Sequence, residues 1–187
     1  MSAKAFAVGL VLAAIGCDNG PRRITAADIV PITPGTATGS VFAGDYIITG
    51  GLVEGCNCRL GSCATIHVLI GTALSVSQTD GTLEIATATS PGVCTGAADS
   101  DGKFRCNGEI VQPGDVEYTV ASGRIQSANG QPSFLTETEE TTATVQDAGI
   151  DCDIRGTATA HYSGPVAAAL ATGGRSARAI GSSPFGL

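Results

Sequence analysis

Apolar and polar residues alternate with a period of two along most of the chain after Ser40, a pattern typical of β-strands. The clearest stretch is 150–162, where apolar or small residues occupy the even positions and polar residues such as Asp151 and Asp153 occupy the odd ones. Residues 104–110 and 116–120 also carry their apolar residues at even positions. No stretch after Ser40 repeats its apolar residues at helical spacing, so the body is predicted to be all-β.

Short turn signals separate the predicted strands. Asp80-Gly81 lies between the apolar residues of 74–76 and those of 83–85, and Asp-Gly in that setting is a strong hairpin signal. Further reversals are predicted at Asp101-Gly102, Asn129-Gly130 and Ala148-Gly149. Each predicted strand is therefore antiparallel to the next one in the chain.

About eight strands joined in this way predict an antiparallel up-and-down meander, and closure into a barrel removes the exposed edges of such a sheet. A β-sandwich is the alternative. Glycines stand where a curved sheet would bend, at Gly71, Gly108, Gly123 and Gly156. The opening of the first strand, Gly44-Asp45-Tyr46, resembles the Gly-x-Trp start of lipocalin-type barrels, with Tyr in place of Trp.

The stretch 135–146 allows two interpretations, because neither of its faces is plainly apolar. One face carries Thr136, Thr138, Glu140, Thr142 and Thr144, and the other carries Leu135, Glu137, Glu139, Thr141, Ala143 and Val145. The favoured interpretation is an exposed edge strand that its charges protect from further pairing. The alternative is a strand whose threonine face, together with Glu140, lines a polar cavity inside the barrel.

The amino terminus has the composition of an export signal, with Lys4, the apolar run 5–15 and small residues before Cys17. The apolar run is too short to cross a bilayer, which takes roughly 20 residues. Ala14-Ile15-Gly16-Cys17 resembles the lipobox of bacterial lipoproteins, with Ala14 in place of the usual Leu. This resemblance implies that Cys17 becomes the first mature residue, carries the acyl chains and anchors the protein to a lipid bilayer of the cell envelope, outside the cytoplasm.

These features divide the chain into four predicted parts. Residues 1–16 form the signal peptide, and residues 17–40, which contain Pro21, Pro31 and Pro34, form a flexible tether after the lipidated cysteine. Residues 41–163 form the disulfide-bonded β domain, and residues 164–187 form a mobile, weakly basic tail.

Removing Cys17 from the seven cysteines leaves an even number, which suits disulfides in an exported protein. The remaining residues are Cys56, Cys58, Cys63, Cys94, Cys106 and Cys152. Cys94 and Cys106 flank the 99–102 turn, which predicts a bridge between them. In a closed even-stranded meander the first and last strands are neighbours, so one of Cys56 and Cys58 is predicted to bond Cys152 and the other to bond Cys63.

Composition narrows the functional classes. The formal net charge of −7 and a pI near 4.6 argue against nucleic-acid binding, and an aromatic content of 4% argues against a stacking platform. Cys56 and Cys58 lack the common zinc spacing, so disulfides are favoured over a metal site completed by Cys63 and His67. The 99–102 turn lacks the spacing of a calcium loop, and no nucleophile motif accompanies His67 or His161. The sequence therefore predicts no metal, no cofactor and no enzymatic activity, with an envelope hydrolase as the least favoured alternative.

The leading functional hypothesis is the binding of a small apolar or amphipathic ligand in the barrel mouth. The candidate lining residues are Tyr46, Phe104, Tyr118, Glu140 and Tyr162. The alternative is a structural or protein-interaction lipoprotein with a filled barrel. The sequence identifies neither the ligand nor a protein partner.

Overall fold

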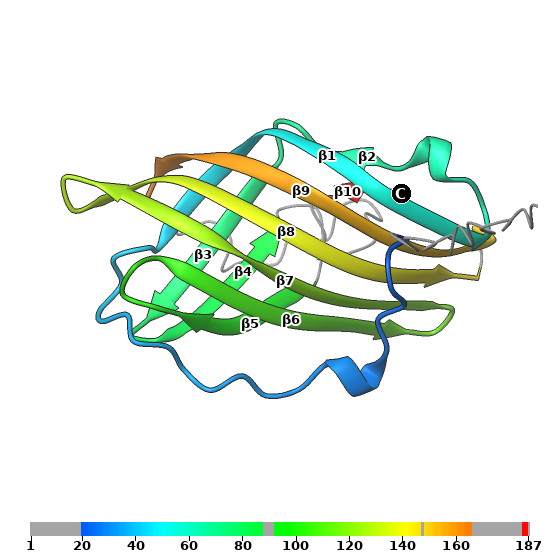
Figure 1. Ribbon diagram of the computed structural model, residues 1–187, viewed down its shortest axis with the longest axis horizontal. Helices are drawn as coiled ribbons and strands as arrows, with labels where there is room; N and C mark the ends of the chain where they lie inside the picture. Colours follow the sequence, from blue (N-terminus) through cyan, green and yellow to red (C-terminus); the bar gives the residue numbers. More distant parts are fainter. Residues whose placement is uncertain (1–19, 88–91, 147, 166–184, 187) are drawn as a thin grey trace, which may run out of the picture.

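The computed structural model describes residues 20–87, 92–146, 148–165 and 185–186, and these form a closed antiparallel β-barrel (Figure 1). The barrel strands are β1 (Gly44–Leu60), β3 (Ala73–Thr79), β4 (Thr82–Thr87), β5 (Val93–Ala98), β6 (Lys103–Gln112), β7 (Asp115–Ala128), β8 (Gln131–Val145) and β9 (Ile150–Gly164). Each pairs with the next in this order, and β9 pairs again with β1. The predicted meander and its closure into a barrel are confirmed.

The remaining described elements are short. They are the 3-10 turns η1 (Ala26–Asp28) and η2 (Cys63–Thr65) and the two-residue strands β2 (His67–Val68) and β10 (Phe185–Gly186). Strand β10 pairs with β2, with Phe185 opposite Val68. The last residues of the predicted mobile tail therefore hydrogen-bond to the body of the protein. Within the described ranges, no helix is long and apolar enough to cross a membrane.

The hairpin turns show why the strands reverse where they do. Asn129 and Gly130, between β7 and β8, both have positive φ, at 54° and 76°. Two successive residues of positive φ match the right-handed twist of the flanking strands, and Asn-Gly adopts this conformation at low cost. The turns at 80–81, 99–102 and 129–130 lie at one end of the barrel. We call it the strap end, because the segment of residues 20–43, described below as the strap, leads to it.

The strap end is filled by apolar side chains. Tyr46, Ile48, Leu74, Val76 and Leu83 are each no more than 1% exposed and belong to one cluster that also contains Phe42, Phe104, Ile125 and Leu135. The Tyr46 hydroxyl donates to the Phe42 carbonyl at 2.8 Å. A side chain of this size finds a hydrogen-bond partner for its polar tip when buried. This end of the barrel is therefore a conventional hydrophobic core.

At the opposite end of the barrel, a disulfide bond joins the first and last barrel strands, β1 and β9, along the seam where the barrel closes. Cys58 stands directly opposite Cys152 and is bonded to it, and Cys56 is bonded to Cys63. The third disulfide joins Cys94 to Cys106. All three pairings match the sequence prediction. We call this end of the barrel the seam end. A smaller apolar cluster of Ile66, Cys152 and Ile154 lies there.

The chain before β1 does not behave as a flexible tether over its described part. Residues 20–43, which we call the strap, run along the outside of the barrel from the β8–β9 wall past β6 to the strap end (Figure 1). Ile24 is fully buried, and its amide donates to Thr142 Oγ1 at 2.7 Å. The Ala37 amide donates to the Ala98 carbonyl at 3.0 Å. The prolines prevent a helix here, but they do not prevent an extended chain from docking.

Two arginines fasten the start of the strap. Arg22 pairs with Glu140 at 2.8 Å, and Arg23 pairs with Asp151 at 3.0 Å. Arg59 of β1 contacts Asp151 and also Asp153, which is only 2% exposed and accepts a hydrogen bond from Thr142. Contacts with Arg23 of the strap and with Arg59 cover Asp153 on the outer face of β9. The predicted signal peptide, Cys17 and residues 166–184 lie outside the described residues.

Candidate ligand-binding site in the barrel interior

The inner wall of the barrel is acidic over part of β7 and β8. Glu117, Thr119, Glu137, Glu139 and Thr141 are between 2% and 5% exposed and face inward. They lie on the side of Leu135 that leads toward the seam end, where Ile154 pairs with Thr141. We call this set the acidic wall. It lies in the interior of the barrel, where most inward-facing residues are apolar.

Hydrogen bonds join four members of the acidic wall. The Thr141 hydroxyl donates to Glu139 Oε1 at 2.6 Å, and the Thr119 hydroxyl lies 3.3 Å from Glu117 Oε1. The two threonine hydroxyl oxygens are 3.0 Å apart. A hydroxyl carries one proton, so Thr119 donates either to Glu117 or to Thr141. The result is a polar chain that crosses from β7 to β8 through the two threonines.

Glu137 stands apart from this chain. It is 5% exposed, and it accepts no hydrogen bond from any described residue. Burial raises the pKa of Glu137 to about 7, because a charged carboxylate loses its hydration in the barrel. Its side chain therefore changes charge near neutral pH.

Small residues flank the two central glutamates. Glu137 pairs across the sheet with Gly123 and Ala158, and Glu139 pairs with Ala121 and Gly156. These partners face inward with the glutamates, because directly paired residues share a face of a sheet. The partners of the two glutamates on β7 and β9 are therefore small, and the ring of Phe104 on β6 lies over Gly123.

The predicted lining residues divide between the two faces of the barrel. Tyr46 and Phe104 face inward, and Tyr162 packs edge-on against Tyr46 with ring centroids 5.6 Å apart. Burial raises the pKa of Tyr46. These three residues belong to or pack on the core of the strap end, so they close that end. None of the three lies on β7 or β8, the two strands that carry the acidic wall.

The predictions for Tyr118 and Glu140 are wrong. Tyr118 lies between the inward-facing Glu117 and Thr119 and is half-buried on the outer face, and Glu140 points outward to Arg22. Strand β8 is also not an edge, since it pairs with β7 and β9 along its length. The buried Leu135 and Val145 fix which face of β8 turns inward. Their shared parity with Glu137 and Glu139 was the sequence signal for the acidic wall.

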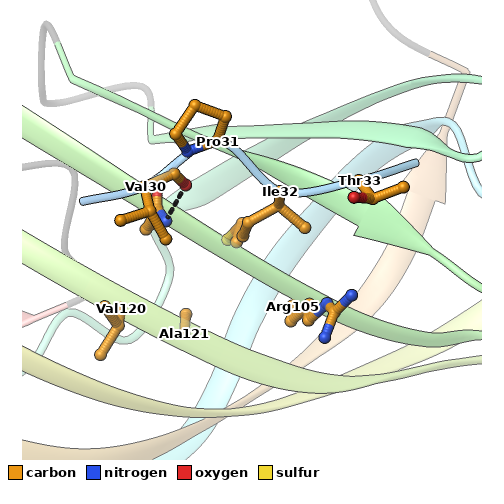
Figure 2. A pocket seen from close by; sticks show the side chains of 9 residues that line it. Val30, Pro31, Ile32, Thr33, Arg105, Val120 and Ala121 are labelled. Atoms are coloured by element: carbon orange, nitrogen blue, oxygen red, sulfur yellow. Dashed lines mark hydrogen bonds between the residues drawn. The ribbon is translucent and has the colours of Figure 1, made fainter. Parts of the chain in front are cut away.

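Val120 of β7 faces outward, toward the strap. Figure 2 shows Val30 and Ile32 of the strap on one side of a pocket and Val120 of β7 on the other. The pocket lies between the strap and strands β6 and β7 and has a volume of about 380 Å³. The Asn107 side-chain amide donates to the Val30 carbonyl across this space at 2.7 Å. Val120 thus has apolar neighbours on the outer side of the barrel. The acidic side is inward instead.

The sulfur cluster at the seam end was the other candidate site. In the described part of the chain, one group of three or more metal-type ligand atoms lies within 4.8 Å, namely Cys56, Cys58 and Cys63. All three sulfurs are in disulfides, and a disulfide sulfur is not the thiolate that metals bind. The 99–102 segment forms a turn, in which Asp101 pairs with Lys103 and Arg124. These contacts, with the Lys103 hydrogen bond first, lower the pKa of Asp101 to about 2.

Comparison with models of protein families, with curated proteins and with solved structures found no match for this chain.

Proposed function

We propose that this protein is a lipid-anchored, extracytoplasmic β-barrel that binds a small amphipathic ligand in its interior. The observation that carries the proposal is the change in the inner wall from apolar side chains at the strap end to the acidic wall further along the barrel. Barrels of this strand number are either filled by side chains or hold one small ligand. An inner wall with apolar and polar parts suits a ligand that has both.

The disulfides support the proposed compartment. Three bridges are present among the described cysteines, and disulfides persist in oxidising compartments rather than in the cytoplasm. The export signal and the lipobox-like Ala14-Ile15-Gly16-Cys17 lead to the same compartment. The anchor is therefore proposed at Cys17.

The strap changes the proposed position of the barrel relative to the membrane. A flexible tether from Cys17 to Ser40 would hold the domain away from the lipid, but Arg22 and Ile24 are already bound to β8. The five-residue step from Cys17 to Arg22 spans at most about 17 Å when fully extended. In this proposal the β8–β9 side of the barrel lies close to the bilayer surface.

The test is native mass spectrometry of the protein purified from its own envelope fraction, with Cys17→Ser as the control variant. We expect an acylated Cys17, three intact disulfides and a co-purified small molecule. We expect the Cys17→Ser protein to keep its disulfides and its ligand but to leave the membrane fraction. A protein that is acylated but free of any ligand under all extraction conditions would support the structural alternative with a filled barrel.

A further inference from the structure

Two disulfide bonds lie in contact at the seam end of the barrel. We call the bond between Cys56 and Cys63 the outer bridge. We call the bond between Cys58 and Cys152 the seam bridge. The Cys58 sulfur is 3.5 Å from the Cys56 sulfur and 3.5 Å from the Cys63 sulfur. Thiol–disulfide exchange requires a thiolate that reaches a sulfur of another disulfide, and both sulfurs of the outer bridge already touch the seam bridge.

The two bridges differ in their access to solvent. Cys152 is only 1% exposed and packs in the smaller apolar cluster of the seam end. Cys56 and Cys63 are both half-buried, so a thiol in solution can reach either sulfur of the outer bridge. The seam bridge presents one half-buried sulfur, that of Cys58, and the outer bridge lies against it. The outer bridge is therefore the more accessible of the two.

A short turn holds Cys63 beside the seam bridge. Gly61 follows β1 with a φ of 90°, a conformation that glycine adopts at low cost. The Ser62 hydroxyl accepts a hydrogen bond from the Ala64 amide at 3.2 Å, and the Ile66 amide donates to the Cys63 carbonyl at 3.2 Å. Cys63 thus belongs to η2, outside the barrel strands. Its sulfur can move toward a neighbouring sulfur without a change in the pairing of the barrel.

This position favours Cys63 over Cys56 as the sulfur that attacks Cys58. Cys56 and Cys58 are two residues apart on β1, and this spacing is about 6.7 Å along a strand. That distance is close to the largest Cα separation, about 6.8 Å, that a disulfide spans. Because Cys63 lies on a turn, a bond from it to Cys58 does not require β1 to shorten. A thiolate at Cys63 would therefore transfer the opening of the outer bridge to the seam bridge.

We propose that the Cys56–Cys63 bridge is an exchange site for an external dithiol, and that the seam bridge opens through Cys63. This inference goes beyond the proposed function and requires no bound ligand. It identifies the partner by its chemistry, as a molecule or protein that carries two neighbouring thiol groups.

The steps are two-electron exchanges. A thiolate of the dithiol attacks Cys56, forms a mixed disulfide and breaks the outer bridge, so that Cys63 leaves as a thiolate. The Cys63 thiolate attacks Cys58 and breaks the seam bridge, and Cys152 leaves as a thiolate that takes up a proton. The second thiolate of the dithiol attacks the reagent sulfur of the mixed disulfide and releases Cys56, which is also protonated. The dithiol is oxidised to a disulfide, and its two protons balance those that the protein gains.

The exchange changes which parts of the chain are covalently joined. The seam bridge links residues 94 positions apart and fastens β9 to β1. The bond that replaces it joins Cys58 to Cys63, within the segment from β1 to η2. After exchange, the hydrogen bonds between β1 and β9 are no longer supported by a disulfide at the seam end.

The first experiment measures the rate at which Cys152 becomes reactive. The intact, folded protein is treated with dithiothreitol at pH 8, quenched with N-ethylmaleimide at successive times and mapped by mass spectrometry. The comparison is the Cys56→Ser/Cys63→Ser variant, which keeps the seam bridge and lacks the outer one. We expect Cys152 to be labelled at least tenfold more slowly in this variant. An equal or faster rate would mean that dithiothreitol attacks Cys58 directly, and the inference would be overturned.

The second experiment uses no reductant and does not depend on the fold of the double variant. Cys56→Ser leaves a free thiol at Cys63, and the matched control Cys94→Ser leaves one at Cys106, the partner of Cys94 in the third bridge. We expect Cys56→Ser to contain molecules with a Cys58–Cys63 bond and a labelled Cys152, and Cys94→Ser to keep the seam bridge intact. The inference is also overturned if the label in Cys56→Ser is confined to Cys63, or if Cys94→Ser exchanges to the same extent.

Discussion

Strands β8 and β9 are neighbours of 15 residues each, and they present opposite chemistry to the same interior. The inner face of β9 carries Cys152, Ile154 and small residues, and it is locked to β1 by the Cys58–Cys152 bridge. The inner face of β8 carries Glu137, Glu139 and Thr141. The inner face of β9 therefore contributes to the stability of the fold. The inner face of β8 carries buried carboxyl groups, which do not stabilise the fold by themselves. That contrast locates the candidate site on β8.

The strap explains how this contrast is tolerated. It covers the outer face of β6 and β7 near Val120 and binds the outer face of β8 at Glu140 and Thr142. Val120 is thereby sheltered on the outer side of the barrel. The interior is then free to carry polar groups between its two apolar clusters.

The largest expected effect is the loss of stability on removal of the Cys58–Cys152 disulfide, which joins β9 to β1. Replacing Cys58 and Cys152 together with Ala should lower the free energy of unfolding by about 4–5 kcal/mol in the chain-entropy model, because the bridge joins residues separated by 94 positions. The control is the Cys56→Ala/Cys63→Ala variant, whose bridge spans a separation of 7 and should cost about 2 kcal/mol. Urea denaturation followed by circular dichroism measures both. Equal losses in the two variants would refute the role assigned to the seam.

The second prediction concerns the inner face of β8 and has the opposite sign. Glu137→Gln should stabilise the unliganded protein at pH 8 by on the order of 2 kcal/mol, since it removes the burial of a charge. The folded-state pKa of Glu137 is raised by burial above its ordinary value of 4.5, to about 7. Its contribution is therefore most favourable below pH 4.5 and is lost as the pH rises to about 7.

The difference in unfolding free energy between wild type and Glu137→Gln, followed from pH 4 to pH 8, measures this effect. We expect the difference to be small at pH 4, to grow through the interval up to about pH 7, and to stay constant above it. A difference independent of pH would mean that the Glu137 carboxyl is not shifted by burial, and the contrast between β8 and β9 would lose its electrostatic part.

The smallest expected effect is on the outer face of β8. Glu140→Gln replaces a carboxylate that pairs with the half-exposed Arg22, and exposed ion pairs contribute less than about 1 kcal/mol. We expect a loss of stability below that figure and no change in the pH profile of unfolding. A loss as large as the gain from Glu137→Gln would show that the strap contact at Glu140 is a main support of the barrel.

Several features followed from the sequence alone. The period of two, the Asp80-Gly81 and Asn129-Gly130 turns and the lack of helical spacing were sufficient for an antiparallel meander of about eight strands. Closure followed because an open meander exposes its edges. The Cys94–Cys106 bridge and a bridge from Cys152 to one of Cys56 and Cys58 followed in turn, and the register of β1 with β9 selects Cys58. These predictions depend on local chain geometry and on chain order, which the sequence contains directly.

Only the tertiary structure decided which face of β7 and β8 turns inward and where the strap lies. The alternation of apolar and acidic residues in a sequence shows that a segment is a strand, but it does not show which face of that strand points into the barrel. The inward face depends on which other parts of the chain cover each side of the strand. On β7 the strap covers Val120 from outside, and on β8 Leu135 and Val145 are held in the interior. The acidic wall exists because those distant contacts outweigh the local preference of a carboxylate for water.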